Sequence, residues 1–391
     1  MELDPQQRRT LTWAGLAVVL LGFDGSVLVL TLPAIAADFH APTRELTNLG
    51  SVLALGALGA LPLATLADRF GRRGLIAMGV AGFSMANFAS GLAPSLEWLA
   101  ALRLVAVCFE AMVAGVATAL VVEEAPPGQR GQAVSVLSLL AGAGTGITVL
   151  SYPLIAPHWR WLFLAGGVGV LLAPAIWCRL PEGRMWLRAS IVSGSALRLL
   201  LQPAWRRRVA VLAAMTALRA VLLGPAGLLF TVYASEVLHL SPTPISVLIV
   251  VSAFVGAASY LVGGYLTDRL GRRAPAIGLS IATALSTTFS FTTGITGFYA
   301  GNVLWSSFSS AATPVFGAWT AELFPTGARA TAEATGSVAG AVGSVVGLQA
   351  VGVLAPSAGL GQAIELLGLA MLAGAFLLFM LPETKQGPLP D

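Results

Sequence analysis

The sequence predicts an all-α membrane protein whose twelve transmembrane helices form two six-helix bundles. Hydrophobic residues make up 56% of the 391 residues and charged residues only 10%, whereas an ordinary soluble domain is about one quarter charged. The apolar segments are long and continuous, unlike the short alternating segments of an outer-membrane β-barrel. Several patterns in the first half recur in the second half. This composition excludes a cytosolic enzyme, a disordered chain and a collagen-like fibre.

Twelve apolar segments approach or exceed the roughly 20 residues that a spanning helix requires. They are expected at 11–37, 47–66, 74–93, 96–122, 131–156, 160–180, 208–234, 244–267, 274–293, 297–322, 329–354 and 360–381. The first is too long for a signal-peptide core and lacks a clear cleavage signal, so we interpret it as a span. We expect an N-terminal bundle at 1–187, a cytoplasmic linker at 188–206 and a C-terminal bundle at 207–391.

The distribution of Arg and Lys predicts the orientation. If the N-terminus lies inside, 18 of the 22 basic residues are cytoplasmic, while only Arg44 and Arg160 lie outside. Because basic loops stay in the cytoplasm, both termini are expected there, in a multi-pass protein of the plasma membrane (the inner membrane in a bacterium). Basic cytoplasmic loops also account for the net charge of +4, so we expect no nucleic-acid partner.

The two halves of the chain carry the same loop patterns at nearly one offset. The pairs are Asp68–Arg73 with Asp268–Arg273 at offset 200, Glu123–Arg130 with Glu322–Arg329 at 199, and Leu180–Glu182 with Leu381–Glu383 at 201. Each half therefore has six spans in the same orientation. A parallel repeat of this kind, rocking about a central site, is typical of secondary transporters.

These loop patterns resemble the major facilitator superfamily, which carries G-x-x-x-D-R-x-G-R-R between its second and third spans. Residues 264–273 match this motif in full, and the first copy has Ala64 in place of the leading Gly. The resemblance covers essentially the whole chain. Further segments resemble the sugar-porter and aromatic-acid/proton-symporter branches: 123–130, 159–161, 180–182, 322–329 and 381–385.

The sequence also departs from patterns of these branches. The seventh span contains Leu218, Arg219 and Ala220 in place of the Gln-rich pattern of sugar porters, so a sugar substrate is not supported. The fifth span has glycines but lacks the Gly-Pro pair of drug/proton antiporters. In the fourth span, Arg103 fits the family pattern, but Val107 replaces the expected Gly four residues on.

Four ionisable residues lie well inside predicted spans: Asp24, Arg103, Glu110 and Arg219. Since a charge in the bilayer is costly, such residues usually face a partner or a cavity. Arg103 and Glu110 are seven residues apart and share a helix face. We expect Asp24 or Glu110 to take up a coupling proton under the control of Arg103, because burial and a nearby cation act oppositely on a carboxyl group. Alternatively, both acids are structural partners of the arginines.

Arg219 is expected to bind an anionic substrate, since a guanidinium fork holds a carboxylate at two points. The alternative is an ion pair with Asp24 or Glu110. The resemblance implies that spans one, four, seven and ten line the central cavity. Span ten carries a polar stripe, which serves either substrate binding or helix packing. Its members proposed to bind substrate are Asn302, Trp305, Ser306 and Ser309.

The resemblance implies that loop acids and arginines pair to form a cytoplasmic gate, although the arginines alone could be topogenic. The gate residues are Asp68, Arg69, Arg72, Arg73, Glu123, Arg130, Glu182, Asp268, Arg269, Arg272, Arg273, Glu322, Arg329 and Glu383. His40, His158 and His239 have no metal-ligand spacing, so no metal site is expected. No phosphate loop or catalytic constellation is found, so neither a cofactor nor an enzymatic activity is expected.

The sequence thus predicts a monomeric secondary transporter that moves a small organic solute by alternating access. Proton-coupled uptake is favoured, with an organic anion as the preferred class of solute. The main alternative is a proton-coupled exporter of drugs or metabolites with the same fold. A membrane receptor or scaffold without transport activity is a further alternative, which the paired gate motifs disfavour.

Overall fold

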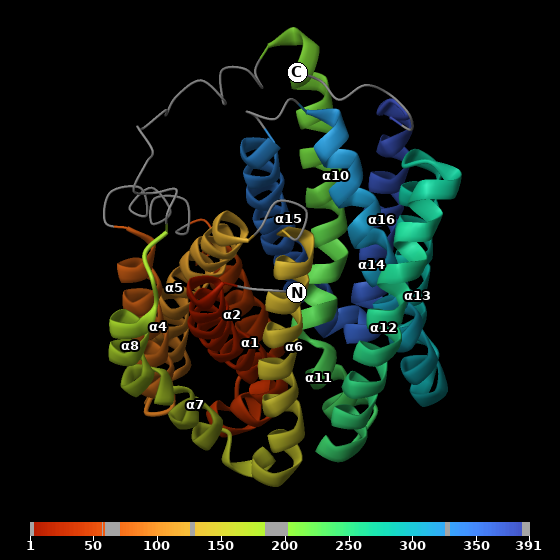
Figure 1. The fold of residues 1–391 in the computed structure, drawn as a ribbon. Coiled ribbons are helices and arrows are strands. Elements are labelled where there is room, and N and C mark those ends of the chain that lie inside the picture. The colour runs from red at the N-terminus through yellow and green to blue at the C-terminus, as the bar shows by residue number, and fades with distance from the viewer. Residues whose placement is uncertain are drawn as a thin grey trace. The chain divides into compact units, whose positions relative to one another are not determined.

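The computed structural model describes residues 4–56, 58, 71–125, 130–183, 202–324 and 329–384. These residues contain helices and no β-strand (Figure 1). In chain order the α-helices are α1(Pro5–Phe39), α2(Thr43–Gly56), α4(Arg72–Ser90), α5(Leu96–Glu124), α6(Arg130–Ile155), α7(Arg160–Gly166), α8(Val168–Arg179), α10(Pro203–Leu228), α11(Phe230–Val232), α12(Pro242–Leu270), α13(Arg273–Thr292), α14(Gly294–Leu323), α15(Arg329–Ala358) and α16(Leu360–Leu377).

Every expected span coincides with helical structure in the described ranges, which confirms the all-α class. Nine described helical stretches are long and apolar enough to cross a membrane. The expected second span is the least defined, because α2 ends at Gly56 and residues 59–70 lie outside the described ranges. Three short helical turns of other types are also present in the described residues. η2(Ala156–His158) and η6(Leu378–Met380) are 3₁₀-helical, and η4(Tyr233–Val237) is π-helical.

Two spans that were expected to be continuous are interrupted. The sixth divides into α7 and α8 at Gly167, whose carbonyl accepts a short-range bond from Val170 N at 3.0 Å. Two successive glycines make such a break inexpensive. The seventh ends its regular part at Leu228 and continues as α11 and a π-helical turn. Pro225 lies just before this change, where its missing N–H leaves the carbonyl of Val221 without a helical partner.

The described helices fall into two compact units. The first comprises residues 1–41 and 55–191, and the second comprises 42–54 and 192–391. The first part of α2 thus groups with the second unit, where Gln349 of α15 donates hydrogen bonds to Asn48 at 3.0 Å and Ser51 at 2.9 Å. The expected linker at 188–206 lies mostly outside the described ranges.

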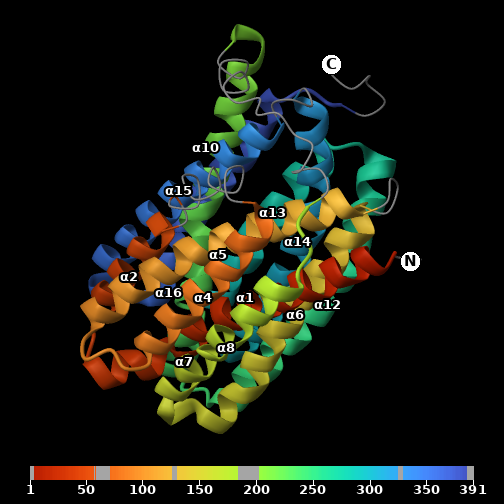
Figure 2. The same cartoon turned by 60° about the vertical axis from the view of Figure 1, so that its left-hand side comes forward.

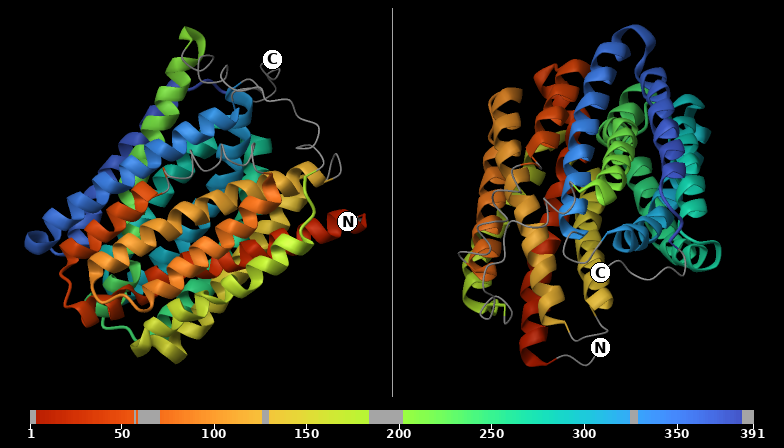
Figure 3. Two further views of the ribbon diagram at one scale, coloured as in Figure 1. Left: turned by 90° about the vertical axis from the view of Figure 1, so that its left-hand side faces the viewer. Right: turned by 90° about the horizontal axis from the view of Figure 1, so that it is seen from above.

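Within each unit the long helices run roughly alongside one another (Figures 2 and 3). In the first unit α1 packs along α6, α4 along α5 and α4 along α8. In the second unit α10 packs along α15 and α13 along α14, so the same pairing recurs. Each unit also has its own buried apolar cluster, around Phe83 and Val113 in the first and Trp319 and Phe324 in the second.

Glycine permits close helix contacts in each unit. A Cβ atom at Gly144 of α6 would overlap the carbonyl of Val19 on α1, and one at Gly343 of α15 would overlap the carbonyl of Ala217 on α10. Gly347 in turn lies against the carbonyl of Val221, the group that Pro225 leaves without a helical hydrogen bond. Small residues that let helix backbones approach closely are typical of packing in lipid.

We expect Gly144→Ala to destabilise the protein by about 1–3 kcal/mol, the usual range for overpacking. Gly142→Ala on the same helix is the matched control, because no atom lies within 4 Å of its added Cβ. The measurement is the melting temperature of each purified variant in the same detergent. Equal melting temperatures for the two variants would contradict the contact between α1 and α6.

Candidate functional site

Three ionisable residues predicted from the sequence meet inside the first unit. Nη1 of Arg103 on α5 donates to Oδ1 of Asp24 on α1 at 2.8 Å, and Nη2 donates to Oε1 of Glu110 at 3.2 Å. Asp24 is 1% exposed, Arg103 2% and Glu110 14%. Glu110 and Asp24 also lie close enough for their carboxyl groups to interact. We call these three residues the ion cluster.

The ion cluster follows from the helix positions of its members. Arg103 and Glu110 lie two turns apart on one face of α5, so the long side chain of Arg103 reaches along the helix to the carboxyl group of Glu110. Asp24 comes from α1, which is held close to α6 by Gly144 and by hydrogen bonds from Thr145 to the carbonyl of Gly22 and from Thr148 to that of Phe23. Two carboxyl groups therefore share one guanidinium.

The formal charge of the ion cluster is −1 when both acids are ionised, and one proton makes it neutral. An unpaired charge in a low-dielectric interior is costly, so the charge balance makes the cluster suited to exchanging a proton. Within the described residues, Oδ2 of Asp24 has no hydrogen-bond partner. Glu110, which is the more exposed of the two acids, offers the easier route to water.

Sequence reasoning missed a fourth member of this region. Asn87 of α4 is fully buried, and its Oδ1 accepts a hydrogen bond from Arg103 Nη1 at 3.1 Å. The ring of Phe163 on α7 lies 5.8 Å from the guanidinium carbon. A single Asn among the apolar residues of the third span was the available signal, since a polar side chain in lipid usually has a partner.

Arg219 lies in the middle of α10 in the second unit and is mostly buried. Within the described residues of that unit it makes no ion pair or hydrogen bond. The other mid-span arginine, Arg103, forms ion pairs with two carboxylates. The two arginines therefore differ in whether their charge is balanced within their own unit. The alternative pairing of Arg219 with Asp24 or Glu110 would join residues of different units, so it stays a prediction.

The polar stripe of the tenth span divides between two environments. Oδ1 of Asn302 accepts a hydrogen bond from Ser252 on α12 at 3.0 Å, and Ser306 donates to the carbonyl of Ser252 at 2.8 Å. These two residues therefore hold α14 against α12. Within the described ranges, Ser309 Oγ is buried without a hydrogen-bond partner, and Trp305 is half-buried without a ring or hydrogen-bond contact.

The two halves treat equivalent positions of this span differently. The offset of 199 that relates Glu123 to Glu322 also relates Arg103 to Asn302, and Glu110 to Ser309. The buried ions of the first half are thus replaced by neutral polar groups in the second half. The fourth span therefore carries a charged site, whereas the equivalent positions of the tenth span are uncharged and one of them, Asn302, contacts a neighbouring helix.

The loop acids form the same contact in both halves. Oε1 of Glu182 accepts hydrogen bonds from the backbone N–H groups of Arg72 and Arg73 at 2.7 and 3.2 Å. Glu383 accepts in the same way from Arg272 and Arg273, each at 3.0 Å. Both acids therefore cap a helix N-terminus, where a negative charge is favourable. Gly71 and Gly271 precede these helices with positive φ angles, of 80° and 91°.

The second half also has a loop ion pair, between Arg272 and Glu322. Arg272 holds Glu322 through Nε at 2.9 Å and Nη2 at 2.6 Å, a two-point contact, and Thr384 also donates to Glu322. Arg273 donates to the carbonyl of Phe379 at 2.6 Å, and its guanidinium lies 5.3 Å from that ring. Arg269 lies 4.8 Å from the ring of Tyr265, and Arg73 lies 5.7 Å from that of Trp177.

The remaining gate residues lie outside what the structure describes. Asp68 and Arg69 fall in the range 59–70, outside the described residues. Glu123, Arg130, Asp268 and Arg329 lie in described helices, but their side chains are outside the description. Each loop contact given above joins residues of one unit. The assignment of these residues to a gate therefore stays a prediction.

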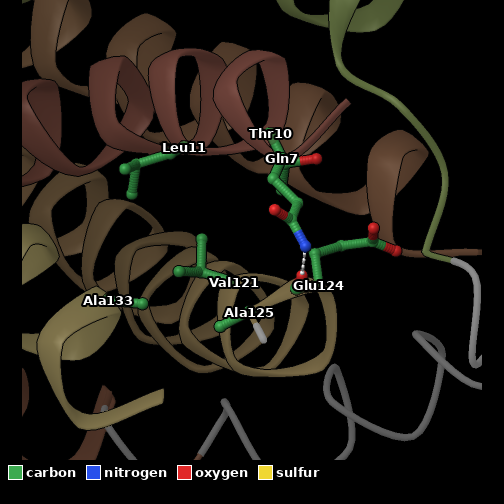
Figure 4. Close-up of a pocket in the computed structure, with 7 residues that line it drawn as sticks. All are labelled: Gln7, Thr10, Leu11, Val121, Glu124, Ala125 and Ala133. Atoms are coloured by element: carbon green, nitrogen blue, oxygen red, sulfur yellow. Dashed lines mark hydrogen bonds between the residues drawn. The ribbon is translucent and has the colours of Figure 1, made fainter. Parts of the chain in front are cut away.

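A further repeated contact was not expected from the sequence. Gln7 at the start of α1 donates from Nε2 to the carbonyl of Glu124 at 2.8 Å, beside a small pocket lined by Thr10 and Val121 (Figure 4). In the second half, Arg208 near the start of α10 donates to the carbonyl of Leu323 at 3.0 Å. In both halves, a side chain near the start of one helix thus donates a hydrogen bond to a carbonyl at the C-terminal end of another helix.

Comparison with known proteins identifies a family pattern over nearly the whole chain. A family model described as Major Facilitator Superfamily matches residues 14–235 and 212–391. A probable 4-methylmuconolactone transporter of Cupriavidus pinatubonensis is 28% identical over 97% of this chain and 92% of its own length. A cis,cis-muconate transport protein of Acinetobacter baylyi is 26% identical over 96% and 94%.

Other relatives match only part of the chain. A puromycin resistance protein of Streptomyces alboniger is 33% identical over 47% of this chain, and the match spans 38% of that relative's own length. Among solved structures, a bacterial homologue of the human lysosomal transporter Spinster superposes with a TM-score of 0.79, at 17% identity and over 97% of each chain. At this identity the superposition shows a shared fold.

Proposed function

Because the chain belongs to the Major Facilitator Superfamily and is a multi-pass membrane transporter of small molecules, we propose that it takes up a small organic anion together with a proton, by alternating access. The observation that carries this proposal is the ion cluster. A buried and a mostly buried carboxyl group share one guanidinium there, in a chain whose full-length relatives are named for the transport of muconate and methylmuconolactone.

The proton site follows from the charge balance of the ion cluster. With both acids ionised, Arg103 is bonded to each of them. Addition of a proton to Glu110 removes the excess negative charge and weakens one of these bonds. Since interfaces between packed helices adopt discrete arrangements rather than deforming continuously, such a change can bias the equilibrium between two states of the transporter. Asp24 remains as the permanent counter-ion of Arg103.

The anion site follows from Arg219. A mostly buried guanidinium without an ion-pair partner in its own described unit is costly. An anionic substrate would supply the missing charge, and its carboxylate matches the two-point geometry of guanidinium. We place the substrate carboxylate at Arg219, with Trp305 and Ser309 of α14 as further candidate contacts.

The membrane setting completes the proposal. We propose that the protein is a monomer in a plasma membrane with both termini on the cytoplasmic side, an orientation that the excess of basic residues in its loops supports. The loop contacts of Glu182, Glu322 and Glu383 then lie on the cytoplasmic side. Among these contacts, Arg272 and Glu322 form an ion pair, and a single exposed ion pair contributes about 0–1 kcal/mol. Further pairs among the remaining gate residues would add to it and could together shift the populations of two states.

Arg219→Lys is expected to weaken binding of cis,cis-muconate by about tenfold or more, because an ammonium group cannot reproduce the two-point contact. Scintillation-proximity binding to the purified protein measures this. Arg206→Lys, an exposed position on the same helix, is the matched control. Unchanged affinity in Arg219→Lys would remove Arg219 from the anion site, and a wild-type protein that binds no carboxylic acid would contradict an anionic substrate.

Proton-driven export of a drug is the second candidate, and the partial match to a puromycin resistance protein favours it. Transport in proteoliposomes distinguishes the two directions. Entry of cis,cis-muconate driven by an inward proton gradient supports the uptake proposal. Extrusion of puromycin against its gradient, without muconate entry, would support the exporter instead.

A further inference from the structure

The side chain of Asn87 occupies an unusual position beside the ion cluster. Its Oδ1 accepts a hydrogen bond from the same Arg103 nitrogen that bonds Asp24, at 3.1 and 2.8 Å respectively. Arg carries donors and no acceptor, so the oxygen of the amide must face it. The amide nitrogen is thereby turned away, and within the described residues it is buried without a hydrogen-bond partner.

The backbone of the interrupted sixth span fixes this orientation. A Cβ atom at Gly166, the last residue of α7, would overlap Nδ2 of Asn87, so the amide lies directly against the glycine. One turn earlier on α4, Ser84 lies in the same way against Gly169 of α8. Gly166 therefore leaves the space that the Asn87 amide fills.

An unpaired buried amide nitrogen costs free energy, so its retention calls for a compensating role. Asn87 is the neutral member among the three hydrogen-bond acceptors of Arg103, beside Asp24 and Glu110. A carboxyl group loses strength as an acceptor for Arg103 when it takes up a proton, whereas the amide oxygen keeps it. The contact with Asn87 is thus independent of the protonation state of the ion cluster.

We propose that Asn87, held by Gly166, is a positioning residue that keeps the Arg103 guanidinium in place while a neighbouring carboxyl group is protonated. The proposal rests on the proposed proton site and adds to it Asn87 and the break between α7 and α8. Without Asn87, protonation would leave Arg103 with one strong acceptor, so protonation becomes less favourable. The pH at which the ion cluster takes up its proton is then lower.

The surroundings of the ion cluster contain no competing charge in the described ranges. Asp24 and Glu110 are the charged groups that act on Arg103. The helices packed around them present uncharged groups: Asn87 and Ser84 on α4, Thr145 and Thr148 on α6, and Phe163 on α7. The arginines of α4, α7 and α8 whose side chains are described, Arg72, Arg73, Arg160 and Arg179, lie at helix ends.

The test is an infrared titration of the carboxyl stretching band, which needs no substrate. The band of the ion cluster is the titrating carboxyl band that is present in the wild type and missing in Glu110→Gln. In Asn87→Leu, a change of similar volume, we expect the midpoint of this band to fall by about one pH unit. Ser84→Ala, at an equally buried position one turn away that makes no bond to Arg103, should leave the midpoint unchanged.

A pair of further variants keeps the test decisive if Asn87→Leu folds poorly. Gly166→Ala should displace the amide and lower the midpoint on its own. When it is added to Asn87→Ala it should have no further effect, because the methyl group enters the vacated space. An unchanged midpoint in both Asn87→Leu and Gly166→Ala would overturn the role of Asn87. The absence in the wild type of any titrating band that Glu110→Gln removes would instead overturn the proton site itself.

Discussion

Arg103→Met is expected to lower the free energy of unfolding by about 3–5 kcal/mol, the largest effect on stability of any single change considered for this protein. The side chain is 2% exposed and bonds Asp24, Asn87 and Glu110 at once. Its removal leaves two neighbouring buried carboxyl groups without their cation. The measurement is thermal or denaturant unfolding of the purified variant at neutral pH.

The matched control removes all three charges together. Arg103→Met combined with Asp24→Asn and Glu110→Gln should recover most of the lost stability, because replacing a whole buried ion set is often neutral. The triple variant should still lack proton-coupled transport. If Arg103→Met were as stable as the wild type, the guanidinium would not be the counter-ion of these acids.

Glu110→Gln is expected to give the largest effect on activity. With one proton moved per substrate, an inward gradient of about one pH unit supports about tenfold accumulation of substrate. The variant cannot exchange the proton, so its accumulation ratio should fall to about one. Exchange of labelled for unlabelled cis,cis-muconate should persist, because the amide keeps the shape of the carboxyl group and the neutral state of the ion cluster.

Glu97→Gln is the control for Glu110→Gln. Glu97 lies in the first turn of the same helix, where it accepts a hydrogen bond from Ser95 at 2.6 Å and is exposed. Its replacement should leave both accumulation and exchange at the wild-type level. Accumulation that persists in Glu110→Gln would transfer the proton role to Asp24 or to another group.

Much of the fold was predictable because the spans and the repeat are encoded in local features. Continuous apolar segments give the helices, and the repeat of Asp68–Arg73 as Asp268–Arg273 gives their duplication. The breaks at Gly167 and after Pro225 were not predicted. Gly and Pro are tolerated in lipid when neighbouring helices compensate, and the compensation depends on contacts such as that of Gly347 with Val221.

The ion cluster was partly predictable. The cost of a buried charge identifies Asp24, Arg103 and Glu110 from the sequence, and the seven-residue spacing of Arg103 and Glu110 places these two on one helix face. Asn87 was not identified, since its partner depends on how α4 packs against α5. The division of the tenth span was equally hidden, because the bonds of Asn302 and Ser306 to Ser252, and the lack of a described partner for Ser309 Oγ, depend on how α12 packs against α14.

Movement of the ion cluster's proton together with the substrate can be followed with a pH-sensitive dye inside proteoliposomes, at clamped membrane potential, when a gradient of cis,cis-muconate is imposed. We expect acidification of the lumen in step with muconate entry, abolished by Glu110→Gln and absent from protein-free vesicles. Entry of muconate at the wild-type rate with no change of internal pH would contradict proton-coupled uptake.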